Sequence, residues 1–193
     1  MDVKTLIIFF AAVIVVWMPL TGYSQKRALI GISVNTNIYP DQISLNKLSI
    51  GATAEAQIGN HSGGEAGLFY RTDRTTEMVS YIDASGSHAY SFTVARRYIA
   101  IPLLYKYYAH HINFSVGPVF DLYSGWKQKN DESPYKVQSY SLNPKFRMGL
   151  LGKLSKTFSV NRNLLLEPEI RLGSVQTLDE LSMGIGIAVK HAL

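Results

Sequence analysis

The segment LLLEPEIRLG, residues 164–173, decides the fold, because apolar and polar side chains alternate through it without interruption. Successive side chains of a β-strand point to opposite faces, so residues of one parity share a face. The even face is apolar and consists of Leu164, Leu166, Pro168, Ile170 and Leu172. The odd face carries charge and glycine and consists of Leu165, Glu167, Glu169, Arg171 and Gly173. The segment therefore predicts a two-faced strand.

The same alternation recurs along the chain and predicts eight strands, at residues 28–35, 47–58, 65–75, 91–108, 112–126, 139–156, 163–175 and 181–192. The connections alternate as well. Long polar segments are expected at 36–46, 76–90 and 127–138, short turns at 59–64, 109–111 and 157–162, and a brief connection at 176–180. An even number of strands, with turns at one end and loops at the other, is typical of bacterial membrane barrels. We therefore expect an all-β fold, an eight-stranded antiparallel transmembrane up-and-down β-barrel.

Alternation alone fits both a membrane barrel with an apolar outer face and a soluble, lipocalin-like barrel with an apolar interior. The strand glycines favour the membrane barrel, because they share the parity of the charged residues: Gly31, Gly51, Gly67, Gly117, Gly149, Gly173, Gly184 and Gly186. Glycine on a solvent-facing strand would cost stability without packing in return, whereas a narrow interior needs small residues beside long charged ones.

We therefore expect the charged parity to fill the interior, where opposite signs can pair. The residues assigned to this lumenal charge network are Glu55, Arg71, Lys106, Asp121, Lys145, Arg147, Lys153, Glu167, Glu169, Arg171 and Lys190. Aromatic residues are expected to form two belts at the membrane interfaces, with Tyr105, Tyr107 and Tyr108 near the short turns and Tyr90, Tyr123, Trp126 and Tyr140 near the long loops.

The N-terminus predicts an exported protein. The apolar run at residues 6–18 is shorter than the roughly 20 residues that a membrane-spanning helix needs, which suits a secretory signal. Gly22 and Ser24 supply small residues before a cleavage site, so we expect a signal peptide at 1–24 and a barrel domain at 25–193. The chain has no cysteine, which excludes disulfides, thiolate metal sites and a lipidated cysteine. Its net charge of +5 is too mild to indicate nucleic acid.

Few residues suggest chemistry. His61 and Ser62 fall in a short turn, His88 in a long loop and His191 on the apolar parity, without a pattern that joins them. Neighbouring residues such as His110 and His111 point to different faces of a strand, and no carboxylate stands at ligand spacing. We therefore expect no catalytic residue, no metal and no cofactor. The interior of an eight-stranded barrel is just filled by side chains, so we also expect a closed lumen and not a channel.

Residues 98–107, YIAIPLLYKY, resemble the Y-hydrophobic-x-I-P-L-L-x-K-Y strand of the PorT-like outer-membrane β-barrel family typical of Bacteroidetes. Three further segments follow in the order of that family: 112–123 with its Gly117-Pro118 pair, the glycine-spaced strand at 146–154, and 164–173. The resemblance implies a small barrel in the outer membrane. Outer-membrane lipid and the barrel-assembly machinery are its expected partners, with envelope or secretion proteins as further candidates.

Our leading functional hypothesis is a small, non-enzymatic outer-membrane barrel that displays its loops, especially 76–90 and 127–138, to envelope components or to the exterior. Two alternatives remain open at this point. One is a barrel enzyme that acts on outer-membrane lipid, and the other is a soluble periplasmic carrier with an apolar cavity.

Overall fold

The computed structural model describes residues 27–38, 48–83, 86–128, 145–175 and 180–193. These residues form nine β-strands, which are β1 (Arg27–Ile38), β2 (Leu48–Gln57), β3 (Ser62–Asp83), β4 (Gly86–Tyr108), β5 (Asn113–Gln128), β6 (Phe146–Ser155), β7 (Phe158–Ser159), β8 (Leu164–Val175) and β9 (Glu180–Ala192). Within the described ranges, no helix is long and apolar enough to cross a membrane.

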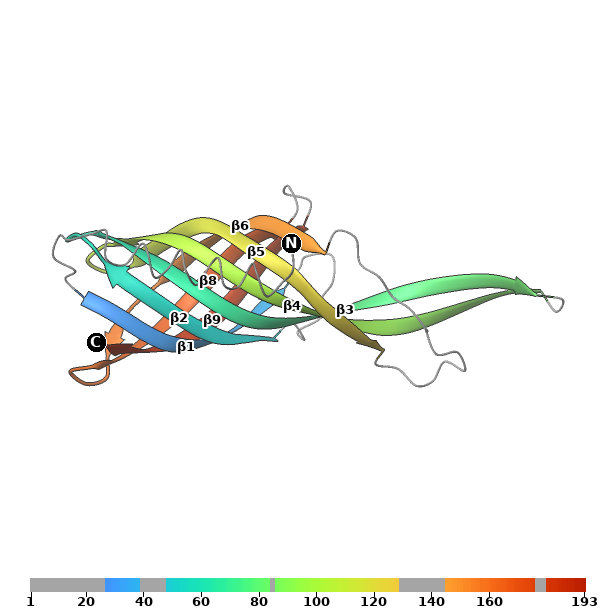
Figure 1. The fold of residues 1–193 in the computed structure, drawn as a ribbon, viewed down its shortest axis with the longest axis horizontal. Coiled ribbons are helices and arrows are strands. Elements are labelled where there is room, and N and C mark those ends of the chain that lie inside the picture. The colour runs from blue at the N-terminus through green and yellow to red at the C-terminus, as the bar shows by residue number, and fades with distance from the viewer. Residues whose placement is uncertain (1–26, 39–47, 84–85, 129–144, 176–179) are drawn as a thin grey trace.

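Eight of these strands close into a ring, which confirms the predicted fold class (Figure 1). Each strand from β1 to β5 pairs antiparallel with the next along the chain. β6 then pairs with β8, β8 with β9, and β9 with β1. β7 lies in the connection between β6 and β8 and pairs only with Leu165 and Leu166. Within the ring, each of the eight strands is paired on both sides, so its backbone N–H and C=O groups find partners, which a bilayer requires.

The two faces of the wall differ as the alternation predicts. On β9, Ile185 is 65% exposed on the outer face, whereas Lys190 is 1% exposed inside the ring. The same difference holds around the barrel, where the exposed large residues are mostly aliphatic or aromatic and the buried set is rich in charge. An apolar outer wall around a charged interior is the arrangement of a barrel that spans a membrane.

Several interior glycines allow neighbouring strands to approach one another. A Cβ added to Gly117 would lie 2.1 Å from the carbonyl oxygen of Leu103 on β4. A Cβ at Gly51 would lie 2.2 Å from the carbonyl oxygen of Leu68 on β3. Both distances are far shorter than a normal contact, so any larger side chain at these two positions would clash with the neighbouring strand. Glycine there also leaves space in the lumen.

Residues 76–90 are the outer part of a β-hairpin and not a loop, which corrects our expectation. β3 and β4 remain paired out to Asp83 and Gly86. β2 flanks β3 only as far as Arg71, and β5 flanks β4 only as far as Val94. Beyond these points no described strand lies beside the hairpin, which projects from the barrel as a two-stranded ribbon (Figure 1). At its tip, Gly86 has a φ of +135°, a conformation that glycine adopts at little cost.

A bulge marks the point where the ribbon leaves the barrel. The register between β4 and β5 shifts between Arg97 and Tyr98, which pair with Gly125 and Tyr123 and leave Ser124 as an extra residue. Gly125 has a φ of +146°, which favours glycine over every other residue. Bulges increase the local twist of a strand pair and are common at barrel rims.

Several other expectations can be compared with the described strands. Tyr105 and Tyr107 face outward near the short turns, as expected. Tyr108 and Tyr123 instead face the interior, where the Tyr108 hydroxyl donates to Glu55 and the Tyr123 ring contacts that of Tyr98 edge-on. The expected turn at 157–162 contains the short strand β7. The signal peptide at 1–24, residues 39–46 and 129–144, and the connection at 176–179 lie outside the described residues.

Candidate functional site

The barrel interior contains its densest polar cluster near the end that carries the short turns, which we call the turn end. Lys106 Nζ on β4 donates to Glu55 Oε2 at 2.9 Å and to Glu167 Oε1 at 2.6 Å. Lys190 Nζ on β9 donates to the same two residues, to Glu55 Oε2 at 2.5 Å and to Glu167 Oε2 at 2.8 Å. Each lysine therefore bridges one carboxylate on β2 and one on β8, across the lumen.

A second set of bonds extends this cluster along the barrel axis. Lys153 Nζ on β6 donates to Glu65 Oε1 on β3 and, at 2.9 Å, to Glu169 Oε2 on β8. Lys190 Nζ lies 3.4 Å from Glu65 Oε2 and joins the two sets. Ser155 Oγ also donates to Glu167 Oε1 at 2.6 Å. The interior of the turn-end half is thus crossed by charged hydrogen bonds in several directions.

The other half of the interior is arginine-rich. Arg71 Nη2 donates to Asp121 Oδ2 at 2.8 Å, and the Arg71 guanidinium lies 5.1 Å from the centre of the Tyr98 ring. The Arg147 guanidinium lies 5.8 Å from the same ring centre. Arg96 Nη2 donates to Asp73 Oδ2 at 3.0 Å. Cations over an aromatic face and beside carboxylates gain attraction at low local dielectric.

The buried charges balance, which makes a closed and stable interior feasible. Of the described residues, six buried acids face six buried bases: Glu55, Glu65, Asp73, Asp121, Glu167 and Glu169, and Arg71, Lys106, Arg147, Lys153, Arg171 and Lys190. Burying a charge is costly unless it is paired and hydrogen-bonded, and removal of one partner from a buried pair costs about 3–5 kcal/mol. Among the residues that the structure describes, charged pairs therefore span the lumen and fill it.

Three carboxylates of this cluster come close enough to suggest a metal site. One oxygen from each of Glu55, Glu65 and Glu167 lies within 4.8 Å of the others. The ammonium groups of Lys106 and Lys190 already lie among these oxygens and neutralise them. The arrangement is a salt-bridge network, whose role in the described interior is structural.

The structure brings together ten of the eleven residues that sequence analysis assigned to the lumen. The exception is Lys145, which is exposed and lies just before β6, where its carbonyl oxygen accepts from the backbone N–H of Tyr123. Its assignment to the lumen was wrong, because parity has no meaning beyond the end of the strand. Sequence analysis missed Glu65 and Asp73, although both share the parity of Gly67 and Arg71 on the same strand.

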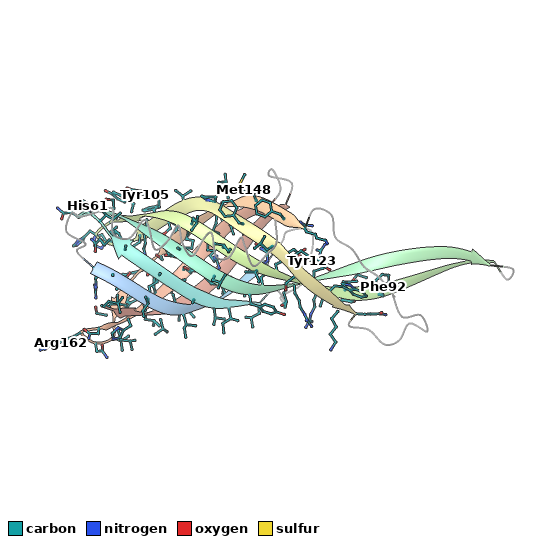
Figure 2. The ribbon with its side chains drawn as sticks, in the orientation of Figure 1. His61, Phe92, Tyr105, Tyr123, Met148 and Arg162 are labelled. Carbon is teal, nitrogen blue, oxygen red and sulfur yellow. The ribbon has the colours of Figure 1, made fainter. Side chains whose placement is uncertain are left out.

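Apart from the neighbours His110 and His111, the histidines fall at separate places in the fold. Figure 2 places His61 and Arg162 at the turn end, opposite the projecting hairpin that contains His88. The His61 ring stacks on Tyr107 with centroids 5.9 Å apart, and its Nδ1 lies 3.0 Å from the carbonyl oxygen of Tyr108. The rings of His110 and His111 meet edge-on at 4.5 Å in an exposed turn. The contacts of His61 are thus those of a structural residue, which packs on Tyr107 and lies within hydrogen-bonding distance of the backbone of Tyr108.

Comparison with known proteins gives only distant likenesses. No family model matches this chain, and no curated protein matches it. The solved structure of Neisserial surface protein A is 13% identical, with a TM-score of 0.48, and the match covers 86% of this chain and 95% of that one. The outer membrane protein OprG of Pseudomonas aeruginosa is also 13% identical, with a TM-score of 0.48 and coverage of 88% and 98%. Ail, the attachment invasion locus protein of Yersinia pestis, is 10% identical, with a TM-score of 0.43 and coverage of 86% and 96%. Likeness at this level carries no argument about function, so the barrel assignment depends on the strand pairing and on the two contrasting faces of its wall.

Proposed function

We propose that this chain is a small, non-enzymatic protein of the outer membrane whose closed barrel anchors the β3–β4 hairpin for contact with envelope components or the exterior. The observation that carries this proposal is the projecting ribbon. From Thr72 to Asp83, β3 continues for about 40 Å beyond its last pairing with β2, at roughly 3.3 Å per residue. Beyond Thr75 and Val94 the two strands, as far as they are described, pair only with each other, so this part of the hairpin has no role in closing the barrel.

The edges of the ribbon suggest how contact is made. Outside the barrel, each strand of the hairpin pairs only with the other along the described residues, so its outer edge presents backbone N–H and C=O groups. Open edges of this kind are templates for an additional strand from another polypeptide. We therefore favour a protein partner that adds an extended segment to β3 or β4.

Placement in the outer membrane is part of the proposal. It is supported by the apolar outer wall, by the even number of strands, and by the predicted signal at 1–24. The resemblance to the PorT-like family agrees with it. Outer-membrane lipid and the barrel-assembly machinery would then be the general partners, with envelope or secretion proteins as candidates for the hairpin.

The two alternative functions fit less well. A soluble carrier needs an apolar cavity, whereas the described interior is filled with paired charges and the apolar side chains face outward. A lipid-modifying enzyme needs a nucleophile beside a base. Of the two histidines considered for that role, His61 lies at the turn end (Figure 2), whereas His88 belongs to the projecting part of β4 at the other end.

Site-specific photo-crosslinking in intact cells tests the proposal. A photoreactive residue is placed at Thr76 or Ser91, which are exposed on the ribbon, and the control is Met148, which is exposed on the outer wall of the barrel. We expect protein adducts from the two ribbon positions that the Met148 control does not form. Identical adducts from all three positions would contradict a specific role for the hairpin.

A shortened hairpin provides the second test. Residues 77–92 are replaced by Asn-Gly, a pair that favours a two-residue hairpin turn, so that the partners Thr76 and Thr93 flank the new turn. We expect this variant to insert into membranes and to resist unfolding as the full chain does, since β3 and β4 keep their pairing within the barrel. If a crosslinker placed elsewhere on this variant still captures all the proteins that the ribbon positions capture in the full chain, the proposed role of the hairpin is wrong.

A further inference from the structure

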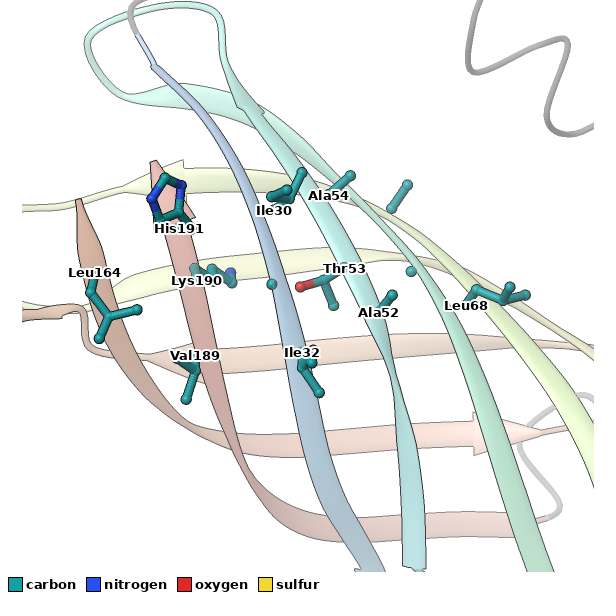
Figure 3. Close-up of a pocket in the computed structure, with 13 residues that line it drawn as sticks. Ile30, Ile32, Ala52, Thr53, Ala54, Leu68, Leu164, Val189, Lys190 and His191 are labelled. Atoms are coloured by element: carbon teal, nitrogen blue, oxygen red, sulfur yellow. The ribbon is translucent and has the colours of Figure 1, made fainter. Parts of the chain in front are cut away.

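An open hollow of about 620 Å³ lies on the outer wall of the barrel, over the start of β8 and over β9, β1, β2 and β3 (Figure 3). Its lining is almost wholly apolar. The bulky side chains around it are Ile30, Ile32, Leu68, Leu164 and Val189, and the small ones within it are Ala52, Ala54 and Ala66. The hollow lies in the wall that the bilayer would cover, so hydrocarbon is its natural content.

The strand register explains why the wall is hollow here. One row of paired residues runs across the sheet from Leu164 through His191 and Ile30 to Ala54 and Ala66. In the next outward-facing row, Ala52 stands between Ile32 and Leu68. The alanines of β2 and β3 thus leave a trough beside the isoleucines of β1.

The apolar hollow continues into a polar one at the turn end. Leu164 and His191 line both, and the second, of about 500 Å³, is completed by Asn161, Arg162 and Asn163. Asn161 Oδ1 accepts from the backbone N–H groups of Asn163 at 3.0 Å and Leu164 at 2.7 Å, which orders the turn. No acidic side chain is found along the described lining of either hollow.

We propose that these two hollows form one binding site for an anionic phospholipid of the leaflet at the turn end. An acyl chain lies in the trough over Ala52, Ala54 and Ala66, and the headgroup phosphate lies against Arg162 and His191. Arginine is the side chain best suited to bind phosphate through charged hydrogen bonds. An apolar trough that opens into a basic pocket matches the two parts of an anionic phospholipid.

The site depends on membrane insertion of the barrel and is independent of the hairpin. Native mass spectrometry of the folded protein in detergent, with added phosphatidylglycerol or phosphatidylcholine, measures it. We expect one tightly retained phosphatidylglycerol per chain and weaker retention of phosphatidylcholine. Arg162→Ala is expected to weaken retention of phosphatidylglycerol roughly fivefold, as for the loss of one basic residue at an anionic lipid surface.

Ala54→Phe fills the trough and is expected to abolish retention of either lipid. Ala66→Leu is a milder variant with the same expectation, in case the first does not fold. The matched controls are Lys156→Ala, which removes a basic residue at the same end, and Val116→Phe, which enlarges an exposed residue of β5. Both controls should retain lipid as the unmodified chain does, and so should the shortened hairpin variant, which separates this inference from the function of the hairpin.

Three outcomes would overturn the inference. Equal losses for Arg162→Ala and Lys156→Ala would mean that only the general charge of the turn end attracts lipid. Unchanged retention in Ala54→Phe and Ala66→Leu would mean that the trough is not the binding site. If the unmodified chain forms dimers in the same spectra, and these two variants lose the dimers but still bind lipid, the trough is a contact between two copies of the chain.

Discussion

Glu167 is the most sensitive test of the charged interior, because it accepts three short bonds at once. They come from Lys106 Nζ at 2.6 Å, Ser155 Oγ at 2.6 Å and Lys190 Nζ at 2.8 Å. Glu167→Gln retains the size of the side chain and removes its charge. Both lysines then remain buried with less compensating charge, and such a loss costs about 3–5 kcal/mol.

The assay is urea unfolding of the barrel refolded in detergent micelles from a chain that lacks residues 1–24, followed by the fluorescence of Trp126. With a slope of about 2 kcal/mol per molar urea, a loss of about 4 kcal/mol lowers the midpoint by about 2 M. The control is Lys127→Gln, which removes an exposed charge on β5 and should change the free energy of unfolding by less than about 0.5 kcal/mol. A shift in Glu167→Gln no larger than that of the control would refute the argument that the interior depends on paired charges.

Three further predictions concern the wall and the lumen. Ile185→Lys places a charge on the outer face, where Ile185 is 65% exposed. In vesicles it should destabilise the folded barrel by about 2–4 kcal/mol, and an unchanged stability would argue against contact with hydrocarbon. Gly117→Ala should destabilise the barrel by about 1–3 kcal/mol in the urea assay, because its Cβ would meet a carbonyl oxygen at 2.1 Å, while Gly152→Ala, where the nearest atom is 3.7 Å away, should be nearly neutral. Planar-bilayer recordings should give no porin-like conductance, since paired charges cross the lumen, and a stable large channel would contradict the closed interior.

Parity in the sequence predicted the two faces of the wall well. Side chains of a strand alternate with a period of two residues, so a shift by one residue would move every side chain to the other face. Once one face must contact lipid, the face of each residue is therefore fixed. Leu104 is an apolar residue on the charged parity of β4, and it is buried inside the barrel, as that parity predicts. Phe69 is a second apolar residue of the interior, where the Arg171 guanidinium lies 5.5 Å from its ring centre.

The projecting ribbon could not be predicted in the same way. Its sequence contains strand-favouring residues such as Thr75, Val79 and Tyr90, but it lacks the apolar stripe that a lipid-facing strand requires. Without that stripe the segment resembled a polar loop. The signal available was the Gly86 turn between two runs of threonine, valine and tyrosine.

The pairing of charges was also beyond the sequence. Lys190 and Glu55 are 135 residues apart in the chain, and only ring closure places β9 beside β1, with β2 on the other side of β1. Parity can place both residues inside the barrel. It cannot say which lysine reaches which carboxylate, because that depends on the stagger of all eight strands.

The central claim is that lipid surrounds this barrel and that charged side chains fill it. Because the chain has no cysteine, single cysteines can be introduced along β9 and spin-labelled one at a time in vesicles. Accessibility to oxygen, which concentrates in hydrocarbon, should be high at Met183, Ile185, Ile187 and Val189 and low at Ser182 and Ala188. A profile without this two-residue period, or with the two sets reversed, would contradict the account.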